Sequence, residues 1–165
     1  YDFSPLAESI IKNLNDKEWA KKVYKKAAEI AESSYEFMYL GDTIYEQLGD
    51  KEWARKVYVK SEKKAEGRDD FRSIAHSIIK NLGDKEWARR IYKIVEGKID
   101  NCHIDQYYYV EFADDICNYL GDKEWAKKVY KKAEERGIEL SMLAASIRDN
   151  LGDKKWAKEL EDADD

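Results

Sequence analysis

The five-residue segment Asp-Lys-Glu-Trp-Ala occurs four times in this chain, and a fifth copy has Lys in place of Glu. Its tryptophans are separated by 34, 34, 38 and 31 residues. Self-similarity at a period of roughly 20–50 residues is the signature of stacked structural repeats. Such an array seldom holds a single catalytic centre and usually offers a long surface to a partner. The repeated segment therefore favours a repeat array whose role is binding.

Each repeat is predicted to be two helices separated by a tight break. The break is Leu-Gly-Asp in four repeats and Leu-Asn-Asp in the first. Glycine takes the left-handed conformation that ends a helix, and Asn is its best substitute. Asp then caps the next helix by accepting a hydrogen bond from a backbone N–H. We therefore expect an all-α chain of five helix-turn-helix repeats, with about ten helices.

Both helices of each repeat carry an apolar stripe at helical spacing, which indicates one buried face per helix. We divide a single repeat domain, 1–165, into units of approximately 1–34, 35–68, 69–106, 107–137 and 138–165. The predicted structural core contains the tryptophans and tyrosines of the second helices: Trp19, Trp53, Trp87, Trp125, Trp156, Tyr24, Tyr58, Tyr92 and Tyr130.

The second helices resemble those of the tetratricopeptide-repeat family. Gly-Asp opens the helix, Ala follows, and an aromatic residue stands four positions later, as at Gly49-Asp50, Ala54 and Tyr58. The chain departs from the family in lacking its closing proline and in having a tryptophan directly before the alanine. The resemblance implies an α-solenoid, a right-handed superhelix whose first helices line a concave groove for a protein or peptide segment.

The first helices differ sharply between repeats outside their core positions, whereas the second helices are near copies. Variation therefore falls where the family would hold a ligand. The groove lining carried over from the resemblance is Lys12, Asn13, Tyr39, Thr43, Glu46, Gln47, Ser77, Lys80, Asn81, Glu111, Asp115, Asn118, Tyr119, Asp149 and Asn150.

Asparagine recurs at one equivalent position of this lining, as Asn13, Asn81 and Asn150, with Gln47 and Tyr119 in the other repeats. Side-chain amides can pair with the backbone of a bound peptide, since each offers a donor and an acceptor. They can equally assist the neighbouring helix break. The sequence leaves both interpretations open.

Aromatic residues gather in two further places on the first helices. These are Tyr35, Phe37, Tyr39 and Tyr45, and then Tyr107, Tyr108, Tyr109, Phe112 and Tyr119. Three consecutive tyrosines cannot all face inward on a helix, so at least one should be exposed. Each cluster is either an interface anchor or filling for the space beside a long connection.

Composition opposes several classes of function. A net charge of −5 and a pI of about 5.3 disfavour nucleic acid and anionic membranes as partners. No apolar run approaches the roughly 20 residues that span a bilayer. Two histidines, and the spacing of Cys102, His103 and Asp105, match no zinc pattern. We expect no enzyme activity, no metal and no cofactor.

The two cysteines, Cys102 and Cys117, are too few for a disulfide framework. We expect free thiols in a reducing, cytoplasmic compartment, with a single bridge as the alternative.

The function predicted from the sequence is a non-catalytic scaffold that binds a protein or peptide segment in its groove. The alternative is a self-assembling structural repeat module, a natural fragment or a consensus design, that stacks through uncapped ends, because a repeat cannot bury its apolar face alone. A helical-repeat reader of RNA is a remote third possibility.

Overall fold

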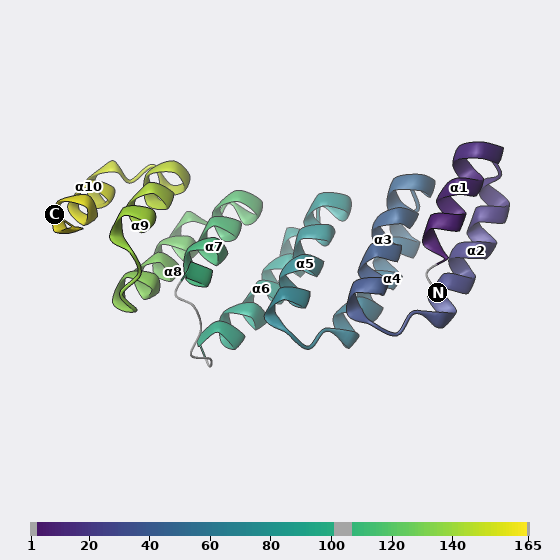
Figure 1. The fold of residues 1–165 in the computed structure, drawn as a ribbon, viewed down its shortest axis with the longest axis horizontal. Helices are drawn as coiled ribbons and strands as arrows, with labels where there is room; N and C mark the ends of the chain where they lie inside the picture. Colours follow the sequence, from purple (N-terminus) through teal and green to yellow (C-terminus); the bar gives the residue numbers. More distant parts are fainter. Residues whose placement is uncertain (1–2, 101–106, 165) are drawn as a thin grey trace. The chain divides into compact units, whose positions relative to one another are not determined.

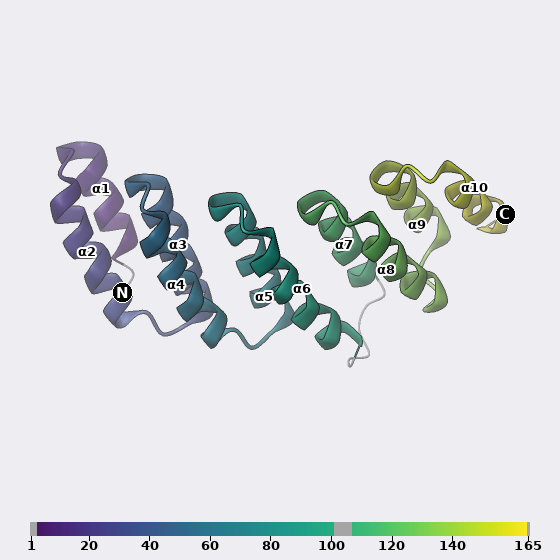
Figure 2. The same ribbon diagram turned by 180° about the vertical axis from the view of Figure 1, so that it is seen from behind.

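The computed structural model describes residues 3–100 and 107–164, and every regular element within them is helical. The chain forms two compact units, Tyr1–Lys98 and Ile99–Asp165. Within each unit, successive helical hairpins lie side by side in chain order (Figure 1, Figure 2). The boundary between the units falls in the longest interval between tryptophans.

Three hairpins make up the first unit. Their elements are α1 (Ser4–Leu14), α2 (Lys17–Ile30), α3 (Ser34–Leu48), α4 (Lys51–Lys64), α5 (Arg68–Ser77), its π-helical continuation η1 (Ile78–Leu82), and α6 (Lys85–Asp100), whose last two residues fall in the second unit.

The second unit contains two hairpins, in each of which the first helix ends in a π-helical turn. Their elements are α7 (Tyr107–Asp115), η2 (Ile116–Leu120), α8 (Lys123–Glu135), α9 (Leu140–Ser146), η3 (Ile147–Leu151) and α10 (Lys154–Asp164).

The breaks between paired helices have the conformation that the sequence predicts. Asn15 at φ 52° and the four break glycines at φ 70–75° are left-handed. In all five hairpins the Asp after the break accepts a hydrogen bond from the tryptophan backbone N–H, at 2.8–3.1 Å. The capping prediction is therefore confirmed, and it sets where each second helix begins.

The core of each of the first four hairpins is centred on the tyrosine of its second helix. Tyr24, Tyr58, Tyr92 and Tyr130 are fully buried. A small residue of the first helix gives the ring its space: a Cβ added to Gly41 would lie 2.6 Å from Cε1 of Tyr58. The small position of the first-helix stripe thus allows close approach of the paired helices.

Burial of the tryptophans varies, and Trp19 requires a correction. Trp87 and Trp125 are 6% exposed, Trp53 and Trp156 are half-buried, but Trp19 is 48% exposed and lies largely outside the core. The physical reason is that at the junctions within each unit the tryptophan contacts the hairpin before it, and no described hairpin precedes α1.

The covering contacts can be seen at three junctions between hairpins. The Trp53 ring meets the edge of Tyr24, with 6.4 Å between ring centroids. Arg55 lies over Trp87 at 5.2 Å, and Lys127 lies over Trp156 at 5.4 Å. The indole N–H of Trp87 also donates to Glu62 Oε2 at 2.8 Å.

The longer interval between the third and fourth tryptophans is partly taken up by helix. α6 has 16 residues, against 14 in α2 and α4. Residues 101–106, with Cys102, His103 and Asp105, lie outside the described part of the chain. Cys117 is a half-buried free thiol, and burial raises its pKa. Among the described helices, none has both the length and the apolar character needed to cross a membrane.

Candidate functional site

The exposed side chains of α1, α3 and α5, the first helices of the first unit, are here called the first-helix face. Lys12, Asn13 and Gln47, all predicted groove residues, line one shallow hollow on it between α1 and α3. Pro5, Glu8 and Ser9 complete the lining. The Asn13 amide donates to Ser9 Oγ at 2.9 Å and is otherwise directed to solvent.

A second hollow lies between α3 and α5. It is lined by Tyr35 and Met38 from α3, by Asp69 and Asp70 from α5, and by Ser34 and Ser73. Tyr35 is 66% exposed. This hollow therefore combines an accessible aromatic ring and a thioether with two carboxylates.

Tyr39 lies between the two hollows. Its ring stacks on that of Tyr35, with centroids 6.4 Å apart and planes inclined by 12°. Its hydroxyl donates to Glu8 Oε1 at 3.1 Å, which joins α3 to α1. The tyrosines of this cluster are thus exposed or half-buried, whereas Phe37 is buried.

The predicted groove residues Glu46 and Lys80 form an exposed ion pair at 3.0 Å between α3 and η1. Thr43 is buried and donates to the Leu40 carbonyl of its own helix at 3.1 Å. Thr43 therefore does not present its hydroxyl to a ligand.

Ser77 and Asn81 are also buried, and their partners belong to the preceding hairpin. The Asn81 amide donates to Asp42 Oδ1 and to the Tyr58 hydroxyl, each at 2.7 Å. Ser77 Oγ donates to Asp42 Oδ2 at 3.1 Å, and the Tyr58 hydroxyl donates to Oδ1 at 2.6 Å. Asp42 thus accepts hydrogen bonds from residues of α4, α5 and η1. The four residues Asp42, Tyr58, Ser77 and Asn81 are here called the Asp42 network.

Burial dominates the electrostatics of the Asp42 network. Desolvation raises the pKa of Asp42, and the hydrogen bonds from Tyr58 and Ser77 oppose that rise only in part. Desolvation and the adjacent carboxylate also raise the pKa of Tyr58 far above its ordinary value. Tyr58 therefore remains a protonated hydroxyl that donates to the Asp42 carboxylate.

The second unit contains the same arrangement around Asp114. The Tyr130 hydroxyl donates to this carboxylate, and so do Ser146 Oγ at 3.4 Å and the Asn150 amide at 2.8 Å. Burial again raises the pKa of the carboxyl group. Two of the three recurring asparagines therefore join neighbouring hairpins, and neither interpretation made from the sequence describes them.

The other predicted groove residues of the second unit are not gathered around one hollow. Asp115 is buried, whereas Glu111, Asn118, Tyr119 and Asp149 are exposed. The tyrosine run 107–109 divides as its spacing requires: Tyr107 is 39% exposed, while Tyr108 and Tyr109 are buried.

Sequence reasoning missed Asp42 and Asp114, which organise both networks. A signal for them exists in the chain. Each Asp directly follows the small residue of its first helix, and the next hairpin carries Ser and Asn four residues apart, as at Ser77 and Asn81. First helices without this Asp have Glu8, His76 or Ala145 at the same position.

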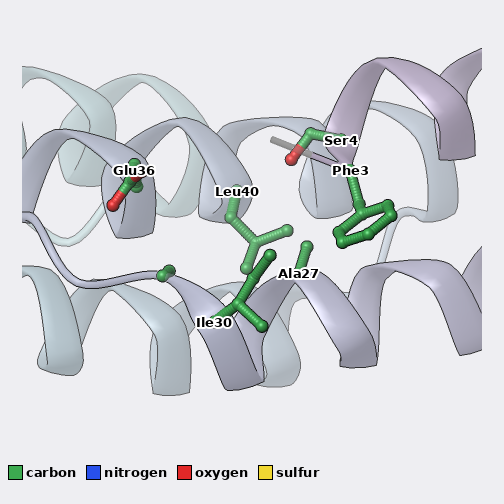
Figure 3. A pocket seen from close by; sticks show the side chains of 7 residues that line it. Phe3, Ser4, Ala27, Ile30, Glu36 and Leu40 are labelled. Carbon is green, nitrogen blue, oxygen red and sulfur yellow. The ribbon is translucent and has the colours of Figure 1, made fainter. Parts of the chain in front are cut away.

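A small, partly open cavity lies at the N-terminal end of α1, against α2 and α3 (Figure 3). Phe3, Ala27, Ile30 and Leu40 line it, and its volume is about 30 Å³. That volume accommodates about two water molecules. The cavity is a packing defect between hairpins and is too small for an organic ligand.

Comparison with protein-family models, with curated protein sequences and with solved structures finds no match to this chain.

Proposed function

We propose that this protein is a non-catalytic scaffold that binds an extended segment of another protein along the first-helix face of its first unit. A right-handed superhelical stacking of the tetratricopeptide type is part of the same proposal. The observation that carries it is the pair of hollows on either side of the stacked Tyr35 and Tyr39. Exposed, rigid aromatic side chains beside a concave surface are typical anchors of protein interfaces.

The lining of the second hollow indicates the chemistry of the partner. Tyr35 and Met38 offer an apolar contact, and Asp69 and Asp70 lie beside them. A Lys or Arg side chain places an aliphatic stem next to a positive head, so it matches both parts of this lining. The net charge of −5 favours approach of a basic segment.

The buried polar residues of the Asp42 network support the same function, because they hold together helices that form the first-helix face. Asn81, Ser77 and Tyr58 direct their hydrogen-bonding groups to Asp42 and not to solvent. Their bonds fix α3 against α5 and its continuation η1, and α3 and α5 enclose the second hollow. A preorganised surface binds a flexible segment with a smaller entropic cost.

The test begins with a phage-displayed library of random peptides selected on the intact protein. We expect enrichment of sequences that combine Lys or Arg with an aromatic or aliphatic residue. Binding of the synthesised peptides is then measured by calorimetry with the wild type and with Tyr35→Ala. Loss of a central aromatic anchor weakens binding at least about tenfold.

The matched control is Tyr107→Ala, which removes an exposed tyrosine from the second unit. It should leave the affinity unchanged. Equal binding by the wild type and Tyr35→Ala, or failure of any peptide to be enriched, would count against the proposal.

A further inference from the structure

Three apolar residues of the first hairpin are exposed, although their counterparts in later hairpins contact the hairpin before them. Leu6 is 49% exposed, Leu14 is 59% exposed and Trp19 is 48% exposed. The counterparts of Leu6 include Leu40, which lies against Ala27 and Ile30 of the preceding hairpin around the cavity of Figure 3. Trp87, the counterpart of Trp19 in the third hairpin, is 6% exposed, and Leu48 and Leu82, the counterparts of Leu14 within the first unit, are half-buried. The first hairpin therefore presents a face that is built like a covered junction.

Two of the covered junctions share one polar pattern on their second helices, whereas at the junction of α2 with α4 the equivalent Lys21 pairs with Glu18 of its own helix. At the junction of α4 with α6, Arg55 pairs with the capping Asp84 at 2.7 Å and lies over Trp87. At the junction of α8 with α10, Lys127 pairs with the capping Asp153 at 2.8 Å and lies over Trp156. A cation two residues after one tryptophan thus contacts the cap and the ring of the next hairpin.

The first helices add a second pair to one of these junctions. Glu46 of α3 pairs with Lys80 of η1 at 3.0 Å. Both residues stand five positions after the small residue of their own first helix. The preceding hairpin supplies the acid and the following hairpin supplies the base.

The first hairpin has the residues that a preceding hairpin would contact in this pattern, and the last hairpin has the residues that would contact a following hairpin. The first hairpin has Asp16 and Trp19 at the positions of Asp84 and Trp87, and Lys12 at the position of Lys80. The last hairpin has Lys158 at the position of Arg55 and Lys127, and Asp149 at the position of Glu46. Lys12, Asp149 and Lys158 are exposed, and none has an ion-pair partner within residues 3–100 and 107–164.

We propose that the first hairpin of one molecule, here called the head, packs against the last hairpin of a second copy, here called the tail. Lys158 pairs with Asp16 of the other copy and lies over its Trp19, and Asp149 pairs with its Lys12. The charges are complementary at both pairs, and Leu14 and Trp19 become covered. The contact shares Lys12 with the first hollow, whereas Tyr35 and Met38 of the second hollow lie outside it, so the two proposals are tested by different variants.

The contact between copies should be weaker than an internal junction. Ala145 stands where an Asp42 network would need its carboxylate, and Glu161 stands where it would need the tyrosine hydroxyl. Glu161 instead pairs with Arg148 of its own hairpin. The two intermolecular ion pairs lie at the surface, so added salt should weaken the association.

A head-to-tail contact leaves one free head and one free tail, so it continues to grow or closes into a ring. In sedimentation equilibrium, the weight-average mass of the wild type should rise above 19.4 kDa with concentration. The range from about 10 µM to about 1 mM suits a weak interface. Trp19→Ala removes the head contact, and Lys158→Glu removes the tail contact, so each variant alone should stay at the mass of one chain.

Mixing these two variants gives the sharpest readout. The intact tail of Trp19→Ala meets the intact head of Lys158→Glu, so the mixture should reach the mass of two chains and no more. Lys128→Glu makes the same change of charge on α8 in place of α10 and should assemble like the wild type. The circular dichroism of each variant verifies that it is folded.

Three results would overturn the proposal. The first is a wild-type mass that stays constant over the whole concentration range. The second is a mixture of the two variants that remains at one chain. The third is assembly by Lys158→Glu alone, which would mean that two heads pair symmetrically or that a different surface is used.

Discussion

The side-chain amide of Asn81 donates to Asp42 Oδ1 at 2.7 Å, although the two residues are 39 positions apart in the chain. The same amide donates to the Tyr58 hydroxyl at 2.7 Å. One buried side chain therefore joins both helices of one hairpin to the first helix of the next. The equivalent Asn13 is exposed, and among the residues that the structure describes its side chain bonds only to Ser9. The recurring amide thus has a different role in different hairpins.

Asn81→Ala should lower the free energy of unfolding of the first unit by about 1–3 kcal/mol, because it leaves two buried polar groups short of a donor. Urea denaturation measures this change. Asn13→Ala is the matched control, and an exposed position should change the same quantity by less than about 0.5 kcal/mol. Equal effects at the two sites would show that the Asp42 network contributes nothing to stability.

Gly41→Ala should destabilise the protein by about 1–3 kcal/mol, because overpacking forces buried groups apart. The new Cβ would lie 2.6 Å from the buried ring of Tyr58. Gly97→Ala is the control, since its Cβ would meet nothing within 4 Å. A helical glycine in open space should gain roughly 0.5–1 kcal/mol on replacement by alanine. Thermal or urea unfolding of both variants should therefore shift in opposite directions.

Trp87→Ala should cost about 3–5 kcal/mol, as expected for a buried tryptophan. Its ring is 6% exposed and its N–H is bonded to Glu62. Trp19→Ala should cost less than about 1 kcal/mol when measured on dilute, monomeric protein. The urea midpoints of the two variants provide the comparison. A large loss at Trp19 would mean that the first hairpin buries this ring in solution.

The Asp42 network also makes stability depend on pH. Burial raises the pKa of Asp42 above its ordinary value of 3.8, so in the window above 3.8 the folded protein holds more protons than the unfolded chain. The free energy of unfolding therefore falls as pH rises through that window. Asp42→Asn removes this titration, so the stability of the wild type relative to the variant should decrease between about pH 3.5 and about pH 6.

Urea denaturation across this range measures the difference, and Asp162→Asn supplies the control for loss of an exposed carboxylate. A difference between the wild type and Asp42→Asn that stays constant with pH would contradict the expected direction of the pKa shift.

Local chemistry was sufficient to predict the helices and their ends. The Gly-Asp breaks depend on one left-handed residue and one capping carboxylate, and both act on neighbouring backbone atoms. The burial of Tyr24, Tyr58, Tyr92 and Tyr130 followed from helical periodicity, which places them on the face toward the paired helix. These features need no knowledge of distant residues.

Only the tertiary structure decided what the repeated positions do. Identical tryptophans differ in exposure because Trp19 has no described hairpin before it, whereas Trp87 lies beneath Arg55. Equivalent asparagines differ because Asn81 finds the carboxylate of Asp42 in the preceding hairpin, whereas Asn13 finds only Ser9. In a repeat protein each hairpin is determined by contacts between residues that are close together in the sequence. The role of a side chain between hairpins depends on which residue the adjacent hairpin places opposite it.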